Sequence, residues 1–203
     1  TGAFRRDTIV IELPAGSGWI NNYSVSAYEF LTHGDCATVT LQFSYLPSVF
    51  CYVVDRKAPI NAARELIAAV QSRINDMPED NRPKLYFAGE SLGCYGIVEN
   101  YRDLEELLAA CDGAVFTGPP RMTAFTRRLA RARDRGSLER LPLIDAGQHV
   151  RFASTPEHME HDAFGNEYQR WQRPRVVFGQ HASDAIVWWD RRLIFMRPDW
   201  IQE

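Results

Sequence analysis

The pentapeptide G-E-S-L-G at residues 89–93 constrains the fold of this chain more than any other stretch. An apolar, strand-like run at residues 84–88 leads into it, and a helix-compatible run at residues 94–98 follows it. A G-x-S-x-G sequence between a strand and a helix predicts a sharp turn that exposes the serine at the carboxyl edge of a sheet. Glycines are needed there because the serine backbone is strained and a Cβ on either flank would crowd the neighbouring strand and helix. We therefore interpret Ser91 as a candidate nucleophile; a glycine-rich turn that happens to carry a serine is the alternative.

Strand-like and helix-like segments alternate on both sides of this turn. Runs rich in β-branched residues and bounded by proline and glycine indicate strands, and apolar residues at helical spacing indicate helices. This alternation predicts βαβ units, and therefore an α/β fold in which helices flank a mostly parallel sheet. The expected strands are residues 8–13, 37–45, 84–88, 112–117 and 175–178, and the expected helices are residues 24–31, 62–74, 92–100 and 104–110.

In such sheets ligands bind at the carboxyl ends of the strands, so the loops that follow the strands should share one rim. Residues 121–172 interrupt the alternation on that rim with a basic helix candidate, residues 123–135, and a long polar stretch. An excursion there predicts a lid-like or cap-like insertion within a single domain that spans residues 1–203. The arginines of the basic helix are interpreted as a solvated face, and contact with an anionic lipid surface is the alternative.

The size and charge of the chain exclude some classes of function. Its 203 residues suffice for one domain with a buried core. A formal net charge of −3 argues against a nucleic-acid partner, because no basic excess is available to neutralise phosphates. No stretch approaches the roughly 20 apolar residues of a membrane-spanning helix. The chain has no signal peptide and opens with Thr1 rather than methionine, so we expect a piece of a longer protein.

Neither cysteines nor histidines form a convincing metal-binding pattern. The four cysteines lack C-x-x-C spacing, and those within or beside apolar runs are expected to be buried free thiols. Cys94 is a remote alternative to Ser91 as nucleophile. His158 and His161 would share a helix face, but their flanks are polar and no second ligand cluster accompanies them. We therefore predict neither a metal nor a cofactor.

A serine nucleophile needs a base that takes its proton and an acid that orients this base. In hydrolases with this turn, the chain order is serine, acid, histidine. Asp184 follows the late strand at residues 175–178 and is the predicted acid. The alternative is that Asp184 caps the next helix. Asp190 and Asp162 are weaker candidates.

The histidine is harder to place. None of the five histidines follows His181, although the base is expected after the acid. We favour a base in a C-terminal segment beyond Glu203, because the sheet also looks one strand short there. Within the chain, His181 is the best candidate because it shares a loop with Asp184, and His149 is next.

The oxyanion that forms during acyl transfer needs two amide donors. One is the amide of Leu92, directly after the serine, and the other normally comes from the loop after an early strand. The loop at residues 14–19 has the sequence P-A-G-S-G-W, and its glycines allow a close approach of the backbone. The amide of Ser17 or Gly16 is the predicted second donor. A nucleotide-phosphate loop is a weaker interpretation, because neither G-K-[ST] nor a full G-x-G-x-x-G follows.

Short segments spread through nearly the whole chain carry a more specific resemblance. They are residues 1–4 (TGAF), 14–19 (PAGSGW), 42–48 (QFSYLPS), 89–93 (GESLG), 117–120 (TGPP), 180–184 (QHASD) with 187–189 (VWW), and 197–200 (RPDW). In this order they resemble the catalytic domain of a bacterial membrane-associated α/β-hydrolase family whose members carry an N-terminal bundle of transmembrane helices. The resemblance implies Ser91 as nucleophile and supports Asp184 as acid. It also implies a domain that extends beyond both ends of this chain, a histidine-bearing segment after Glu203, and a parent protein in the cell membrane.

Together these features predict a serine hydrolase that acts on carboxylic esters through an acyl-enzyme on Ser91. The 12% aromatic content and the membrane-linked parent favour a lipid ester or an acylated envelope component over other small molecules. The turn is equally compatible with an acyltransferase. A rival from another class is a non-catalytic binding or assembly domain of a membrane protein, which the missing histidine favours.

Overall fold

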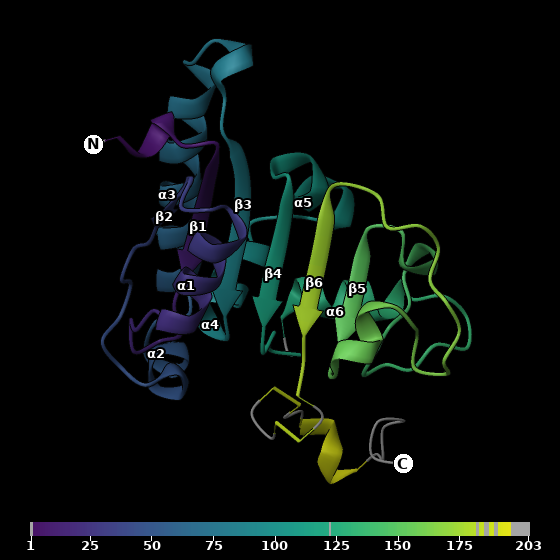
Figure 1. The fold of residues 1–203 in the computed structure, drawn as a ribbon. Coiled ribbons are helices and arrows are strands. Elements are labelled where there is room, and N and C mark those ends of the chain that lie inside the picture. Colours follow the sequence, from purple (N-terminus) through teal and green to yellow (C-terminus); the bar gives the residue numbers. More distant parts are fainter. Residues whose placement is uncertain (1, 122, 182, 185–186, 189–190, 196–203) are drawn as a thin grey trace.

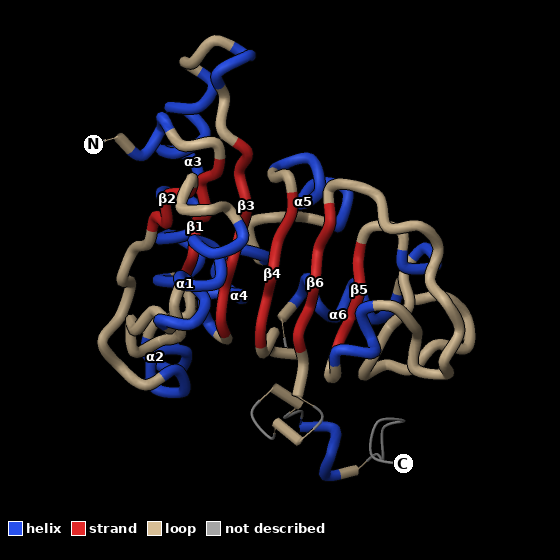
Figure 2. Tube along the Cα trace, viewed as in Figure 1, coloured by secondary structure: helices blue, strands red, loops and turns tan. Residues whose placement is uncertain are grey.

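The computed structural model describes residues 2–121, 123–181, 183–184, 187–188 and 191–195. Within these residues, six parallel strands form one sheet in the order β2-β1-β3-β4-β6-β5, with helices on both faces (Figures 1 and 2). The predicted α/β fold with a mostly parallel sheet is therefore confirmed. No helix within the described ranges has both the length and the apolar character needed to cross a membrane.

The strands and helices follow the alternation of the sequence closely. The strands are β1 (Thr8–Leu13), β2 (Cys36–Val39), β3 (Lys84–Glu90), β4 (Gly113–Thr117), β5 (Val150–Ala153) and β6 (Arg175–Gly179). The α-helices are α1 (Asn22–Leu31), α2 (Ser48–Val54), α3 (Ala58–Asn75), α4 (Leu92–Val98), α5 (Leu104–Ala110) and α6 (Ala124–Arg131). Short 3-10 helices lie at Ala3–Arg5, Glu79–Asn81, Asp145–Gly147, Pro156–Met159 and Arg191–Ile194.

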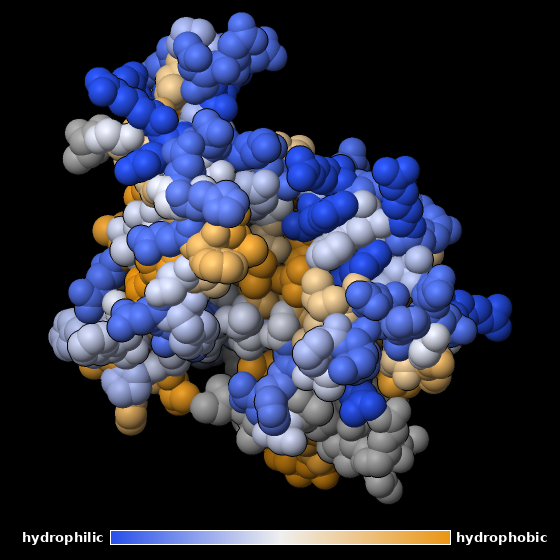
Figure 3. Space-filling model, viewed as in Figure 1, coloured by the Kyte–Doolittle hydropathy of each residue, from blue (hydrophilic) through white to orange (hydrophobic). Residues whose placement is uncertain are grey.

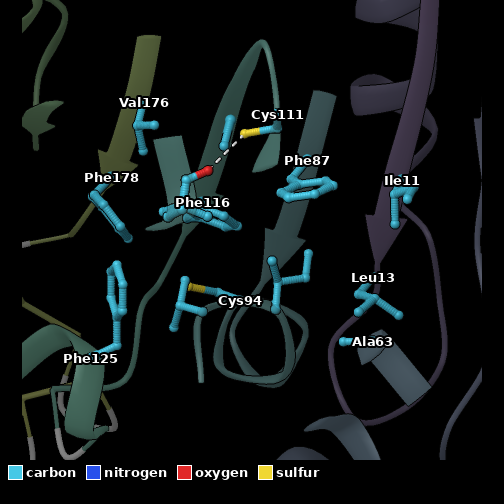
Figure 4. Close-up of a cluster of buried hydrophobic side chains, with 14 of the residues drawn as sticks. Ile11, Leu13, Ala63, Phe87, Cys94, Cys111, Phe116, Phe125, Val176 and Phe178 are labelled. Atoms are coloured by element: carbon cyan, nitrogen blue, oxygen red, sulfur yellow. Dashed lines mark hydrogen bonds between the residues drawn. The ribbon is translucent and has the colours of Figure 1, made fainter. Parts of the chain in front are cut away.

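The hydrophobic core fills one face of the sheet. Side chains alternate along a strand, so every second residue of β1, β3, β4, β5 and β6 points into this core. Figure 4 shows several of them, with Phe87, Phe116 and Phe178 facing Cys94 of α4 and Phe125 of α6. The helix α3 contributes a stripe at positions 63, 67, 70 and 74, which is the spacing of one helical face. This packing fixes α4, and with it the start of the helix after Ser91, against the sheet.

The opposite face is covered less completely. The helix α1 lies over the β2–β1 side of this face (Figure 1). Val115, in the middle of β4, remains 46% exposed. The space-filling view shows apolar surface near the middle of the same face (Figure 3).

The structure departs most from the sequence-based expectation in two strands and in α2, a helix that was not predicted. β2 ends at Val39, whereas the predicted strand ran to residue 45. β5 lies within residues 121–172, so part of the range predicted as an insertion belongs to the sheet itself. Arg151 hid this strand, because a charged residue in its middle broke the apolar pattern. Its guanidinium is buried over the rings of Tyr168 and Trp171, 4.6 and 4.4 Å from their centroids. That the remaining residues act as a lid stays a prediction.

Candidate active site

Ser91 sits in the turn between β3 and α4 with a backbone conformation that a non-glycine residue rarely adopts. Its φ is 52° and its ψ is −110°. A positive φ with this ψ is strained for an L residue with a side chain. The Ser91 amide donates a hydrogen bond of 2.8 Å to the Thr117 carbonyl at the end of β4, and the Ser91 carbonyl accepts one of 3.0 Å from Tyr95. The strained strand-to-helix turn expected from the sequence is present.

Close approaches at two glycines explain why this turn excludes side chains. A Cβ on Gly89 would lie 2.7 Å from the Cys94 amide nitrogen, and one on Gly93 would lie 2.0 Å from the Leu13 carbonyl oxygen. Real Cβ atoms do not come this close to backbone atoms. The first contact presses β3 against α4, and the second presses α4 against the end of β1.

This second contact places the start of the loop that carries Ser17 beside the helix that begins at Leu92. Leu92 is the first residue of α4, and first-turn amides have no partner within their own helix. Gly93 follows it and touches the end of β1, where the loop at residues 14–20 begins. The turn at residues 89–93, here called the elbow, and the loop therefore adjoin at the carboxyl edge of the sheet.

Within the loop the two candidate amides differ. The Gly16 amide donates a hydrogen bond of 3.0 Å to Ser48 Oγ at the start of α2. A Cβ on Gly16 would lie 2.6 Å from Ser48 Cα, so the glycine allows this contact. Among the described residues the Ser17 amide makes no hydrogen bond. Of the two, the Ser17 amide therefore stays the predicted second oxyanion donor.

Asp184 lies in a turn after β6 at the same edge of the sheet. Its Oδ1 accepts a hydrogen bond of 3.0 Å from the Val187 amide, which is the capping role weighed against the acid role in the sequence. The turn is attached to the loop after β4, because the Arg121 amide donates to the Val187 carbonyl over 3.1 Å. Asp184 thus belongs to the rim to which Thr117 ties Ser91.

The ring of His181 is oriented by its own loop. His181 Nδ1 lies 3.2 Å from the Ser183 amide, which donates to it. A neutral imidazole that accepts at Nδ1 carries its proton on Nε2. A base in a serine triad has the opposite arrangement, with Nδ1–H on the acid and Nε2 accepting from the serine. Within the described residues no hydrogen bond joins Ser91 Oγ to a histidine, and the role of His181 stays a prediction.

The remaining candidates for base, acid and nucleophile lie away from Ser91, hold local structure or are buried. His149 precedes β5 at the amino edge, opposite Ser91, and its Nδ1 lies 3.0 Å from the Pro174 carbonyl. Asp162 accepts hydrogen bonds from the Phe164 and Asn166 amides and so holds a turn. Asp190 lies outside the described residues. Cys94 is completely buried, and burial raises the pKa of its thiol, so it is no rival to Ser91 as a nucleophile.

In the part of the chain that the structure describes, no group of three or more His, Cys, Asp or Glu side chains is arranged to bind a metal ion. His158 Nδ1 instead lies 3.2 Å from both Ser154 Oγ and Thr155 Oγ1. The cysteines at positions 36, 51, 94 and 111 are free, and all but Cys36 are buried.

A cluster of polar side chains beside the elbow was not predicted from the sequence. Asn21 Nδ2 donates a hydrogen bond to Glu90 Oε2, and Ser24 Oγ donates one of 2.8 Å to Glu12 Oε1. Burial raises the pKa of Glu12; the Ser24 hydrogen bond lowers it, and the charge of Glu90 raises it further. Burial, with a contribution from Glu12, raises the pKa of Tyr28 to about 12. The available signal was a carboxylate inside the otherwise apolar strand β1.

The family comparison agrees with this geometry. A family model described as an alpha/beta-hydrolase family matches residues 1–203. The chain belongs to the α/β-hydrolase family. Hydrolase activity is the class of function that this membership supports. A solved acetylxylan esterase structure is similar over 89% of this chain and 84% of that chain, with a TM-score of 0.48 and 11% sequence identity. No curated protein matches the chain.

Proposed function

We propose that this α/β-hydrolase cleaves carboxylic esters through an acyl-enzyme on Ser91. The observation that carries the proposal is the strained backbone of Ser91, held between β3 and α4 by two glycines that no larger residue could replace. Strain of this kind costs free energy and persists where a function depends on it. Here it presents a hydroxyl at the carboxyl edge of a parallel sheet, where such folds bind ligands.

The proposed reaction assigns a role to each residue at this edge. A base takes the proton of Ser91 Oγ as the oxygen attacks the ester carbonyl, and the amides of Leu92 and Ser17 stabilise the resulting oxyanion. Collapse of this intermediate releases the alcohol, which receives the proton from the base. Water then attacks the acyl-enzyme by the same steps and releases the acid. Asp184 orients the base, which is either His181 with its ring turned or another histidine.

The proposed substrates are lipid esters or acylated envelope components. Their support is an apolar surface on α2, where Val49, Phe50, Val53 and Val54 are all more than half exposed. The opposite side of α2 buries Cys51 against Leu92 and Tyr95, the residues that follow the nucleophile. The helix that carries the apolar surface therefore packs on the elbow, and an acyl chain or a membrane surface would meet this face of α2. A membrane-linked location of the protein is part of the same proposal.

Two alternatives use the same surface differently. Transfer of the acyl group to an alcohol instead of water would make the protein an acyltransferase, and the elbow suits both acceptors. A non-catalytic binding or assembly domain is favoured by one observation, namely that His181 Nδ1 accepts a hydrogen bond from the Ser183 amide, whereas the base of a triad donates from this nitrogen.

Covalent labelling by a fluorophosphonate, followed by intact mass, tests the proposal. An activated Ser91 is expected to gain one phosphonyl group, and Ser91→Ala is expected to abolish the gain. Ser72→Ala is the matched control, because Ser72 is an exposed serine on α3. His181→Ala separates the two candidate bases, since labelling survives this change only if another histidine serves. A folded protein that is not labelled would contradict the proposed ester hydrolase and favour the non-catalytic binding or assembly domain.

A further inference from the structure

The elbow holds the proposed oxyanion loop at both of its ends. At the first end, Gly93 touches the Leu13 and Pro14 carbonyls, where the loop at residues 14–20 leaves β1. At the second end, Asn21 follows the loop and its side chain binds Glu90. Glu90 directly precedes Ser91, and Gly93 follows it by two residues. The nucleophile therefore lies between the two residues that fix the loop.

The use of Asn21 is unusual for its position. Asn21 is the N-cap residue of α1, where an asparagine side chain ordinarily accepts a hydrogen bond from the first turn of its own helix. Here it makes no such bond. Its amide group instead reaches Glu90, which lies 69 residues away in the sequence. The local stabilisation of α1 is given up for a contact with the elbow.

A second contact braces the same part of α1 against the sheet. Ser24, in the first turn of α1, donates to Glu12 Oε1 on β1 over 2.8 Å. Glu12 is only 7% exposed, and its Oε2 is buried without a hydrogen-bond partner among the described residues. A buried carboxyl oxygen without a hydrogen-bond partner costs free energy. Glu12 and Glu90 thus engage the start of α1 from two adjacent strands.

We propose that Glu90, acting through Asn21, is a positioning residue that sets the Ser17 amide relative to Ser91, with Glu12 and Ser24 bracing the start of α1. This inference rests on the proposed function, because it concerns the second oxyanion donor of that reaction. The physical reason is the tolerance of the site. An oxyanion donor acts only within about 0.5 Å of its productive position, and a misplacement of about 1 Å lowers the rate about 100-fold.

A double-mutant cycle on the full chain tests this tie. Asn21→Ala, Glu90→Ala and their combination each remove the contact, whereas Glu90→Gln keeps an oxygen that accepts from Asn21. Asn61→Ala is the matched control, since Asn61 accepts a hydrogen bond from Arg64 on the exposed side of α3. The first readout is the rate of fluorophosphonate labelling, separated into maximal rate and half-saturating concentration. The second is amide hydrogen exchange of residues 15–20, with β4 as the internal reference.

The tie predicts one pattern in both readouts. Each single variant should lower the maximal labelling rate about 10- to 100-fold with little change in half-saturation. The double variant should be no slower than the single ones, and Glu90→Gln should recover most of the rate. Exchange of the loop amides should rise in the same variants while β4 stays protected. Labelling of Asn21→Ala and Glu90→Ala at the wild-type rate would overturn the inference.

Failure of the proposed function has a different signature. If the wild-type chain is not labelled, the enzyme proposal falls and loop exchange decides the tie by itself. Equal exchange in all variants would then overturn the positioning role. Faster loop exchange in Asn21→Ala and Glu90→Ala, but not in Glu90→Gln, would support the positioning role as a feature of the fold.

Discussion

The Ser91 amide and the Thr117 carbonyl lie 2.8 Å apart in a hydrogen bond that joins the strained turn after β3 to the end of β4. The bond crosses between two central strands of the sheet, whose last paired residues are Glu90 and Thr117. It holds Ser91 in a conformation that the chain would otherwise leave. Stability and presentation of the hydroxyl are therefore opposed at this residue.

Ser91→Gly is expected to stabilise the fold while it removes the nucleophile. Glycine adopts a positive φ without the steric cost that Ser91 bears, so relief of strain should add about 1 kcal/mol to the free energy of unfolding. Urea denaturation measures the change, and fluorophosphonate labelling should be lost. Ser72→Gly in α3 is the control of opposite sign, because a glycine in a helix interior lowers stability by about 0.5 kcal/mol. A lower stability of Ser91→Gly would mean that the turn is not strained.

Gly93→Ala is expected to disrupt the elbow. The added methyl would lie 2.0 Å from the Leu13 carbonyl oxygen. This oxygen belongs to the backbone, so the clash is relieved only if β1 or α4 moves. We expect a loss of about 3 kcal/mol or more, at the upper end of overpacking costs. Gly2→Ala is the matched control, since no atom lies within 4 Å of its Cβ position. Equal urea midpoints for the two variants would contradict the close approach.

The buried carboxyl of Glu12 should make stability depend on pH. Its pKa is raised chiefly by burial and further by Glu90, against the lowering effect of Ser24, and Tyr28 is the other titratable group that faces it. A carboxyl group whose pKa is higher in the folded state stabilises the fold fully below its unfolded pKa, and this contribution is lost as pH rises through the raised value.

Urea unfolding between pH 4 and pH 8 measures this contribution. Glu12→Gln is expected to reduce the fall in unfolding free energy as pH rises, because glutamine has no proton to lose. Glu79→Gln, at an exposed glutamate, should keep the wild-type slope. Parallel pH profiles for wild type and Glu12→Gln would show that Glu12 ionises in the fold without cost.

The sequence predicted those parts of the molecule that local chemistry determines. β1 and α5 have the predicted bounds, Thr8–Leu13 and Leu104–Ala110, because each carries an uninterrupted pattern. The elbow was predicted because the glycines that it requires lie within a five-residue motif. β5 was missed because the burial of Arg151 depends on Tyr168 and Trp171, which come later in the chain and are not part of the strand.

The polar tie beside the elbow shows the same limit at the candidate site. Asn21 precedes the predicted helix of residues 24–31, and Glu90 occupies a variable position of the G-x-S-x-G turn. Their contact joins residues 69 positions apart, and no periodic pattern relates them. The acid and base are a harder case, because the hydrogen bonds of Asp184 and His181 depend on how the loop after β6 folds.

The exposed face of α2 should influence which esters react. Phe50→Ser replaces a side chain on α2 that is 63% exposed. If an acyl chain buries this ring, its loss removes about 1.5–3 kcal/mol of apolar contact, which corresponds to a rate about 10- to 100-fold lower on a long-chain ester. Hydrolysis of p-nitrophenyl laurate and p-nitrophenyl acetate measures the effect, and the acetate rate should change little. Phe30→Ser on α1, where the ring is 80% exposed, is the matched control and should leave the laurate-to-acetate ratio unchanged. An equal change in both rates for Phe50→Ser would mean that α2 does not contact the acyl chain.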